Sequence, residues 1–594
     1  MQILVKADTI LYYSYDFILT FANQLMPLIL HQRKRNFYRY MNTPTLTEKL
    51  LSLDLSKPIV ECMAALSDAD FISQSETFFD KADSIQELLL KQILFYAKDS
   101  KFGKEHGFKD IKNIEDFRKN VPVLYWEDIL PYVEQAANGK ADMLFPGLPT
   151  YFSITSGTTG KEKLIPDNAL SACARNLALR YRLAQIRKYV PNLMSGKLFP
   201  LSNNPSSSTT PAGIPCGTAS GLTLGKAGLD KMLAFPVSVL SITDGQSRDY
   251  VMMRLAIEKE DVMFVVGNNA VRMVNLLDLA IEYKEDIIND IERGGIKEGL
   301  ILDADVRGNL EKTLSPNPSR AAYLRKLVAD GKPFTPASYW KEMKMAMFWL
   351  SSSVGRNVDE VRPYFDSSVK FMDAGYGSSE AKLNIPMMPE EKSGALSIAT
   401  SFYEFIPVDG GEPLLAHQLE DGHEYELVVT TWAGLYRYNM KDIIRVDGFV
   451  GNTPKIEFMR KSGDLLNIAG EKLPAIRVDN TIRQLLNGKG LEVRQSQIYQ
   501  DLDNRRYVCY VEVKDGTLEV DDELQKLFND KLVEDFPFFE LIFGQKLINP
   551  AVLVPMKSGW QEALYAKKLK QGVTKSQIKI PLLIKEPADE IWKM

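Results

Sequence analysis

The segment Ile154–Pro166, with the sequence ITSGTTGKEKLIP, has residue types that can bind phosphate. Its small residues expose backbone N–H groups, which can wrap the oxygens of an anion. Its hydroxyl groups add further donors, and they belong to Thr155, Ser156, Thr158 and Thr159. Lys161 or Lys163 can supply positive charge. We therefore predict a phosphate-binding loop between a strand and a helix.

This loop is not a Walker A motif. A Walker A motif separates its glycines by four residues and places Ser or Thr directly after its Lys. Here two residues separate Gly157 from Gly160, and Glu162 follows Lys161. The alternative to a phosphate site is a flexible Gly/Thr turn.

A second segment, MDAGYGSSEAK at Met372–Lys382, follows a strand-like VKFM. Its glycines flank an aromatic ring and a carboxylate. Tyr376 could stack on a flat ring, and Glu380 could face a cation. The alternative is a helix cap, because glycine-rich turns that end in SSE also begin helices.

A third segment, GLYRYNMKDIIRV at Gly434–Val446, holds Asp442 in a dense mixture of charged and aromatic residues. A carboxylate there could accept two hydrogen bonds from a ribose diol. The alternative for Asp442 is a salt bridge with Arg437 or Arg445.

Several elements must position these segments. Residues 44–140 are predicted to be mostly helical, and Glu87–Lys98 has apolar residues at the spacing of one buried helix face. YFSIT reads as a strand, and a long helix is predicted from Asn168 to about Tyr189. The Ser-, Pro-, Gly- and Thr-rich residues from Asn192 to Lys226 read as a long loop inside a domain. From Tyr250 the alternation of helix and strand predicts a mostly parallel sheet covered by helices.

After Gly394 the pattern changes to short strands, in ALSIAT, FYEFIPV, YELVVTT, IIRVDGF and KIEFMR. From about Pro474 the predicted order is helix, strand, strand, helix, strand, helix, which describes a small α+β module. We predict a large domain over residues 1–467 and a small one over residues 468–594.

The three motifs, in this order, resemble the signature set of adenylate-forming enzymes, the superfamily of acyl-CoA ligases and luciferases. The surrounding sequence is more specific. NVPVLYWEDILPYV, FYEFIPVD, YELVVTTWAGLYRYNMKDIIRVDGF and KQGVTKSQIKIPLLI together resemble the auxin-responsive Gretchen Hagen family of acyl-acid amido synthetases. The resemblance runs from about residue 45 to the C-terminus. One departure is Lys441, which stands where the plant motif usually has Gly before the Asp.

The resemblance implies an α/β fold. The implied fold has a large N-terminal adenylate-forming domain and a smaller, mobile α+β C-terminal domain. The large domain consists of helix-covered sheets and a small β-barrel-like part. It implies a ligase that uses ATP and Mg²⁺ to adenylate a carboxylic acid, with release of pyrophosphate. The amine of an amino acid then attacks, which gives an amide and AMP.

The resemblance also implies roles for residues. Lys579 and Glu380 would be catalytic, and Glu380 would bind the metal. Asp442 would hold the ribose, Lys472 would mark the hinge between the domains, and Lys579 would swing onto the phosphate. The implied nucleotide-binding residues are Thr155, Ser156, Gly157, Thr158, Thr159, Gly160, Tyr376, Gly377, Ser378, Ser379, Asp442, Arg445 and Lys472.

Two other functions compete with an amido synthetase. An acyl-CoA ligase would share the adenylation step but hand the acyl group to a thiol, and the YELVVTT and IKIP segments argue against it. A non-catalytic acyl-adenylate binding protein would have lost catalytic groups, whereas Lys579, Glu380 and Asp442 are present.

The amino-acid composition argues against several other functions and kinds of site. The 72 basic and 77 acidic residues give a net charge of −5, which argues against sequence-independent nucleic-acid binding. The 4 cysteines are widely spaced, so we expect no disulfide framework or zinc site and a reducing compartment. Ile10–Leu30 is interrupted by polar residues and is predicted to be an amphipathic helix packed on the body, or else a membrane-surface helix. We expect a cytoplasmic monomer.

Overall fold

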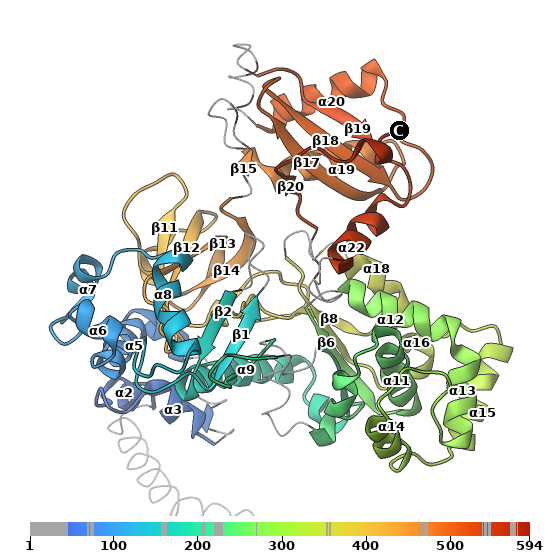
Figure 1. The fold of residues 1–594 in the computed structure, drawn as a ribbon, viewed down its shortest axis with the longest axis horizontal. Helices are drawn as coiled ribbons and strands as arrows, with labels where there is room; N and C mark the ends of the chain where they lie inside the picture. Colours follow the sequence, from blue (N-terminus) through green and yellow to red (C-terminus); the bar gives the residue numbers. More distant parts are fainter. Residues whose placement is uncertain are drawn as a thin grey trace, which may run out of the picture.

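The computed structural model of the chain is shown in Figure 1. It describes residues 46–67, 70–71, 77–155, 163–202, 208–218, 230–268, 270–351, 355, 358–463, 465–466, 468, 473–536, 539, 543, 548–570, 578 and 580–594. The helix predicted over Ile10–Leu30 lies outside these residues. In the described part, no helix is both long enough and apolar enough to cross a membrane.

The N-terminal part is helical, as predicted. Its helices are α2 (Leu46–Leu51), α3 (Ile59–Ala64), α5 (Ala82–Ala97), α6 (Lys101–Glu105), α7 (Ile114–Asn120) and α8 (Trp126–Ala137). The apolar face predicted in Glu87–Lys98 is the buried face of α5, where Leu89 and Ile93 have no exposed surface.

These helices share one hydrophobic core with a six-stranded antiparallel sheet. Its strands are β9 (Asn384–Pro386), β10 (Gly394–Leu396), β11 (Phe402–Pro407), β12 (Glu424–Thr430), β13 (Tyr438–Val450) and β14 (Thr453–Lys461). Their order is β11-β12-β13-β14-β10-β9. The strands after Gly394 were therefore predicted correctly. The expected β-barrel-like part was wrong, because β11 and β9 are the two edges of an open sheet among the described strands.

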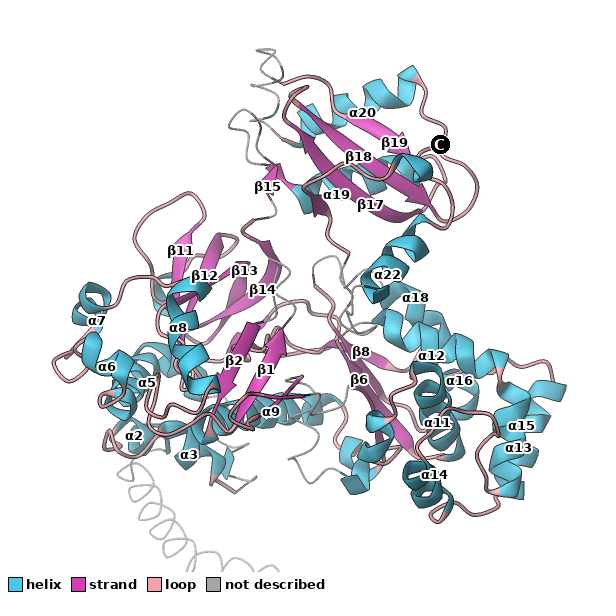
Figure 2. Cartoon of the chain, viewed as in Figure 1, coloured by secondary structure: helices cyan, strands magenta, loops and turns pink. Residues whose placement is uncertain are grey.

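A second, parallel sheet has the order β3-β6-β7-β8. Its strands are β3 (Lys197–Leu201), β6 (Val262–Gly267), β7 (Met345–Phe348) and β8 (Lys370–Asp373). The helices in this part of the chain are α11 (Gly245–Glu258), α12 (Ala270–Glu282), α13 (Lys284–Arg293), α14 (Ala304–Glu311), α15 (Pro318–Ala329), α16 (Pro336–Tyr339) and α18 (Val358–Val361). Figure 2 shows them beside this sheet. The predicted parallel sheet is confirmed.

A third sheet has the order β2-β1-β5-β4. It contains β1 (Tyr151–Thr155), β2 (Lys163–Asp167), β4 (Ser208–Thr209) and β5 (Pro215–Gly217). Two predictions are corrected here. The phosphate-type loop joins the antiparallel strands β1 and β2 rather than a strand and a helix. The stretch from Asn192 to Lys226 contains β3, β4 and β5, so it is not one long loop.

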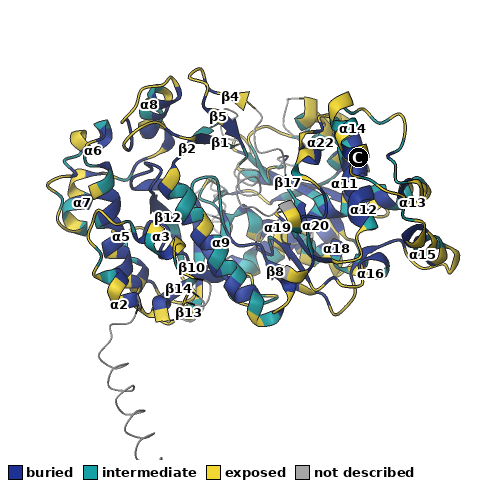
Figure 3. Ribbon diagram, turned by 90° about the horizontal axis from the view of Figure 1, so that it is seen from below, coloured by how far each residue is buried: buried dark blue, intermediate teal, exposed yellow. Residues whose placement is uncertain are grey.

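Helix α9 (Ala169–Tyr189) connects the two large sheets. Leu177 and Tyr181 pack into the core of the antiparallel sheet, whereas Ile186 packs against Met345 and Met347 of the parallel sheet. Figure 3, coloured by burial, shows α9 crossing between the two halves. A helix that contributes to both cores restricts their relative movement.

The C-terminal part is the α+β module that the sequence predicted. Its elements are β15 (Leu465–Leu466), β16 (Leu473–Pro474), α19 (Ala475–Asn487), β17 (Val493–Asp501), β18 (Arg506–Val513), α20 (Asp522–Asp535), β19 (Val552–Pro555), α22 (Trp560–Lys570) and β20 (Leu583–Ile584). Its main core extends from Leu466 to Leu553 and excludes the other sheets. The boundary after residue 467 stays a prediction.

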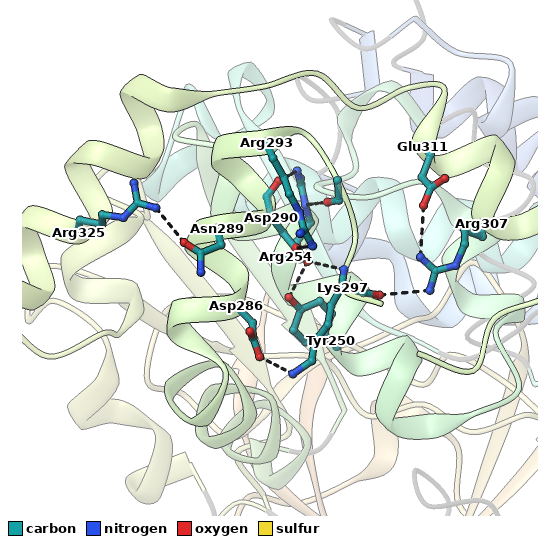
Figure 4. A network of polar contacts seen from close by, with 11 residues as sticks. Tyr250, Arg254, Asp286, Asn289, Asp290, Arg293, Lys297, Arg307, Glu311 and Arg325 are labelled. Atoms are coloured by element: carbon teal, nitrogen blue, oxygen red, sulfur yellow. Dashed lines mark hydrogen bonds and ion pairs between the residues drawn. The ribbon is translucent and has the colours of Figure 1, made fainter. Parts of the chain in front are cut away.

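A buried polar network stabilises the helices beside the parallel sheet (Figure 4). The Asp290 carboxylate on α13 accepts hydrogen bonds from Tyr250 Oη at 2.7 Å and from Lys297 N at 2.6 Å, and it pairs with Arg293 at 2.5 Å. Arg254 is fully buried and donates to the Asp290 carbonyl at 3.0 Å. Because these polar groups form hydrogen bonds with one another, their burial costs little free energy and the network stabilises the packing of the helices.

A buried ion-pair cluster joins the N-terminal helices to the antiparallel sheet. The Glu404 carboxylate on β11 is 1% exposed and accepts from Arg437 Nε at 2.7 Å and from Arg118 Nε at 2.8 Å. Arg437 also donates to the carbonyl of Val121 at 2.7 Å. This cluster fixes the start of β13, where the third motif lies.

We expect Glu404→Gln to destabilise the protein by about 3–5 kcal/mol, because it leaves Arg437 buried without its counter-charge. Urea denaturation would measure the change. The control is Glu292→Gln, which removes a carboxylate that is 45% exposed and pairs with Arg325 on the surface. Exposed pairs contribute about 0–1 kcal/mol, so equal effects of the two substitutions would contradict the prediction.

Asp373 is the last residue of β8, and its side chain is buried. Its oxygens accept from Leu350 N at 2.7 Å and from Gly375 N at 2.6 Å. Burial raises the pKa of Asp373 from 3.8 to about 6, against the influence of these bonds and of Arg182. A raised folded-state pKa makes protonation stabilising. That stability is complete below about pH 4 and is lost as the pH rises through about 6.

We therefore expect the unfolding free energy of the native protein, relative to Asp373→Asn, to fall by about 3 kcal/mol between about pH 4 and about pH 7. Denaturation of both proteins across this range would measure the difference. Parallel stability curves would contradict the prediction.

Candidate functional site

The two ends of the phosphate-type loop lie side by side. Thr155, the last residue of β1, is paired with Lys163, the first residue of β2. The loop itself lies outside the described residues, and with it the predicted site residues Ser156, Gly157, Thr158, Thr159 and Gly160. The hairpin thus fixes where the loop leaves and returns.

Lys163 lies at the base of this loop. Its Nζ is 5.4 Å from the centroid of the Trp126 ring and donates to Tyr438 Oη at 3.4 Å. Burial lowers the pKa of Lys163, and the negative charge of Glu380 is the strongest opposing influence. The base of the first motif therefore shares its electrostatic environment with Glu380 of the second motif.

The second and third motifs meet through one hydrogen bond. Tyr376 Oη donates to Asp442 Oδ2 at 2.5 Å across 66 residues of sequence. The Tyr376 ring is buried and its centroid is 5.1 Å from that of Phe458. The predicted proximity of the two motifs is therefore present in the fold, through a contact between their own side chains.

Asp442 is 3% exposed and forms an ion pair with Lys461 of β14. Strand register explains this pair, because Asp442 on β13 lies opposite Lys461. Burial raises the pKa of Asp442, and Lys461 opposes the rise. Lys461 was missed from the sequence, where it stands 19 residues after Asp442; the pairing of β13 with β14 was the signal that could have found it.

The alternative salt bridges predicted for Asp442 are wrong. Arg437 pairs with Glu404, and Arg445 pairs with Glu457 at 2.7 Å. Arg445 was also predicted to bind the nucleotide, which stays a prediction, and its side chain pairs with Glu457 on the β13–β14 ladder.

The segment Gly377–Lys382 forms a tight turn that presents Glu380. Ser378 N donates to the carbonyl of Ala381 at 2.9 Å, and Ser378 Oγ accepts from Glu380 N at 3.2 Å. The turn leads into strand β9, so the alternative of a helix cap is wrong. Ser378 holds the turn, while its neighbours carry the groups that can face a ligand.

A pocket lies between this turn, the β1–β2 hairpin and the start of α9. The residues that line it include Ser379, Glu380, Lys382, Arg175, Thr431 and Trp432. Asn168 caps α9 by accepting from Ser171 N and also donates to the Trp432 carbonyl at 2.7 Å. The cap of α9 therefore fixes one wall of the pocket.

Lys441 has a left-handed backbone, with φ of 54°. Side chains with a β-carbon rarely adopt this conformation, which explains why a glycine fits the same position in the motif that this segment resembles. Lys441 Nζ is 5.1 Å from the centroid of the Tyr125 ring, and its charge acts on Lys163. The departure from glycine thus adds a cation near Lys163.

No group of three or more His, Cys, Asp or Glu side chains gathers as a metal site among the residues the structure describes. Mg²⁺ commonly keeps several waters and takes one or two protein carboxylates together with phosphate oxygens. A single carboxylate such as Glu380, at the edge of the pocket, fits that donor set.

Lys472 and Lys579 lie outside the described residues, so the structure does not place either lysine. Their neighbours in the chain show only that Lys472 precedes β16 and that Lys579 precedes β20.

Two family models match the chain. The GH3 family N-terminal domain matches residues 71–370, and the GH3 family central domain matches residues 394–461. These ranges include the first and third motifs, and the second motif, Met372–Lys382, lies between them.

Individual proteins match over most of their length. The 4-substituted benzoates-glutamate ligase GH3.12 of Arabidopsis thaliana is 26% identical over 552 residues, which cover 87% of this chain and 95% of that protein. The indole-3-acetic acid-amido synthetase GH3.3 of the same plant is 24% identical over 543 residues, covering 84% and 89%. Among solved structures, AtGH3.15 acyl acid amido synthetase in complex with 2,4-DB matches with a TM-score of 0.76 and 22% identity, covering 88% of this chain and 94% of that one. The fold is therefore that of these synthetases, and the chain belongs to the GH3 family.

Proposed function

We propose that the protein is an ATP-dependent acyl-acid amido synthetase. It adenylates a carboxylic acid, releases pyrophosphate and transfers the acyl group to the amine of an amino acid. Family membership supports this proposal, because the relatives are named as amido synthetases and as an acid–glutamate ligase. The observation that carries it is the contact between Tyr376 and Asp442, which joins two separate motifs beside the phosphate-type loop.

The chemistry explains why these groups gather. A carboxylate is a poor acylating agent, and joining it to AMP gives it a good leaving group. Attack of the carboxylate on the α-phosphate builds negative charge. Backbone N–H groups and lysines can stabilise that charge, and Lys163 and Lys441 stand at the base of the loop.

We assign the residues as follows. The loop residues bind the phosphates, the Tyr376 segment lines the adenine and α-phosphate site, and Asp442 holds the ribose. The phosphate-binding residues are Thr155, Ser156, Gly157, Thr158, Thr159 and Gly160, and the adenine-side residues are Tyr376, Gly377, Ser378 and Ser379. Because Asp442 already accepts from Tyr376, one of its oxygens is held in place before a ribose arrives.

Mg²⁺ is proposed as the metal that accompanies ATP, with Glu380 as its protein ligand. Bound there, it would neutralise charge on the phosphates. Glu380 is fixed by the turn that Ser378 holds and lies in the same electrostatic environment as Lys163. The negative charge of Glu380 therefore acts at the base of the phosphate-type loop, on Lys163.

The small C-terminal domain, residues 468–594, is proposed to move relative to residues 1–467 between the two half-reactions. Its separate core supports independent movement. Lys472 would lie at the hinge, and Lys579 would approach the α-phosphate when the domain closes.

Amide formation should require an amino acid and should be indifferent to coenzyme A. AMP release with each acceptor, in the presence of ATP and a panel of carboxylic acids, would measure this. Turnover with coenzyme A alone would identify an acyl-CoA ligase instead.

Lys579→Ala should lower the rate of adenylation by roughly 10²–10³, by analogy with the loss of one preorganised donor to the transition state. Pyrophosphate release would measure it. Lys570→Ala is the matched control, since Lys570 ends α22 and is exposed. Equal pyrophosphate release from both variants would show that Lys579 has another role.

A further inference from the structure

Two groups of charges lie around the segment Gly375–Lys382. The first group, Glu380, Glu127, Lys461 and Lys441, acts on the pKa of Lys163. The second group, Arg182 and Arg175, acts on the pKa of Lys382, which lines one pocket together with Arg175 and Glu380. The first group lies at the proposed nucleotide site. The second group has no role in the proposed binding of ATP.

This second group has an excess of positive charge. Arg175 is neutralised, because it pairs with Asp167 at 2.6 Å. Lys382 forms no ion pair with a carboxylate among the residues that the structure describes, whereas the negative charge of Asp373 acts on Arg182. Arg182 Nε is buried and has no hydrogen-bond partner. The network around Asp290 in Figure 4 is different, because there each buried arginine has acceptors.

The position of Lys382 is fixed by close packing against the glycine turn. A β-carbon at Gly377 would lie 2.8 Å from Lys382 Cδ and 3.3 Å from Nζ, and one at Gly375 would lie 2.2 Å from an Arg182 nitrogen. Both cations therefore lie against the same short stretch of backbone. The glycines make room for them.

Lys382 also lines the pocket, and two further polar groups of that pocket lack partners. Thr431 Oγ1 and Trp432 Nε1 are buried without a hydrogen bond in the described part of the chain. Burial and the two arginines lower the pKa of Lys382 to about 8, so the side chain is still a cation at neutral pH. A partly buried cation without a counter-charge is costly, unless a ligand supplies the counter-charge.

We propose that Lys382 is a specificity-determining residue that binds a substrate carboxylate other than the one that is adenylated. This inference rests on the proposed function. The reacting carboxylate must meet the α-phosphate near the base of the phosphate-type loop, where Glu380 acts on Lys163, whereas Lys382 and Arg182 pack against Gly377 and Gly375. The second carboxylate has two possible sources, a dicarboxylic acyl acid or the α-carboxylate of the acceptor amino acid.

The test compares the native protein with Lys382→Met in two assays. The first is ATP–pyrophosphate exchange without an acceptor, using hexanoate against adipate and benzoate against terephthalate. The second is amide formation with alanine against alaninamide. Loss of one charged partner should raise the relevant KM about 10- to 100-fold, while the acid or amine without the extra carboxylate is unaffected.

The assay that changes identifies the source. A selective loss with adipate or terephthalate assigns the dicarboxylic acid, and a selective loss with alanine assigns the acceptor. The thermal midpoint of Lys382→Met should stay equal or rise, because an unneutralised charge is removed. The control Lys455→Met removes a partly buried lysine that pairs with Glu391 at 2.5 Å, and it should lower the midpoint without changing either preference.

In each assay, the preference is the ratio of the KM values for the substrates without and with the extra carboxylate. If this ratio differs by less than about twofold between the native protein and Lys382→Met in both assays, the inference is overturned. A loss that is equal for substrates with and without the extra carboxylate would also overturn it. Exchange with none of the acids would refute the proposed function itself. Exchange with monocarboxylic acids and no role for Lys382 would refute only the inference.

Discussion

The buried carboxylate of Glu404 is the interaction on which the geometry of the site depends. It draws Arg118 from α7 and Arg437 from the residue before β13 to one point inside the core. Arg437 adopts a φ of 43°, an unusual conformation for arginine that these contacts hold in place. The chain then enters β13 at Tyr438, four residues before Asp442. This cluster, together with the pairing of β13 with β12 and β14, fixes the third motif relative to the N-terminal helices.

Beyond the start of β13, strand pairing determines which groups contact the Asp442 carboxylate. The β13–β14 ladder places Asp442 opposite Lys461, and the turn after β8 brings Tyr376 to the same carboxylate. A buried carboxylate that already holds one cation and one hydroxyl is preorganised, so little has to move when a diol binds. The two sheets meet at this contact, because β8 belongs to the parallel sheet and β13 to the antiparallel one.

The glycine turn between the sheets carries the groups of both proposed roles. Tyr376 bonds to Asp442, Glu380 acts on Lys163, and the arginines of α9 act on Lys382. In the proposed reaction, one short segment would therefore act on the phosphate and on a second substrate carboxylate. A β-carbon at Gly375 or Gly377 would displace the Arg182 or the Lys382 side chain from its present position.

Local patterns in the sequence determined much of the fold. The apolar spacing in α5, the strands after Gly394, the α+β order of the C-terminal part and the three motifs all depend on short-range periodicity and composition. They led to the family before any geometry was known. Weaker signals failed: β3 and β5 lie in a Ser- and Pro-rich stretch whose composition is typical of a loop.

Tertiary structure alone decided which charges meet. From the sequence, Arg437 and Arg445 were the nearest candidates for Asp442, yet the ladder and the core direct them to Glu404 and Glu457. Lys461 reaches Asp442 only because two strands pair, and Lys382 faces Arg182 only because α9 packs across both sheets. Sequence distance does not predict these contacts, because the electrostatic partners of a buried group are set by which elements pack together.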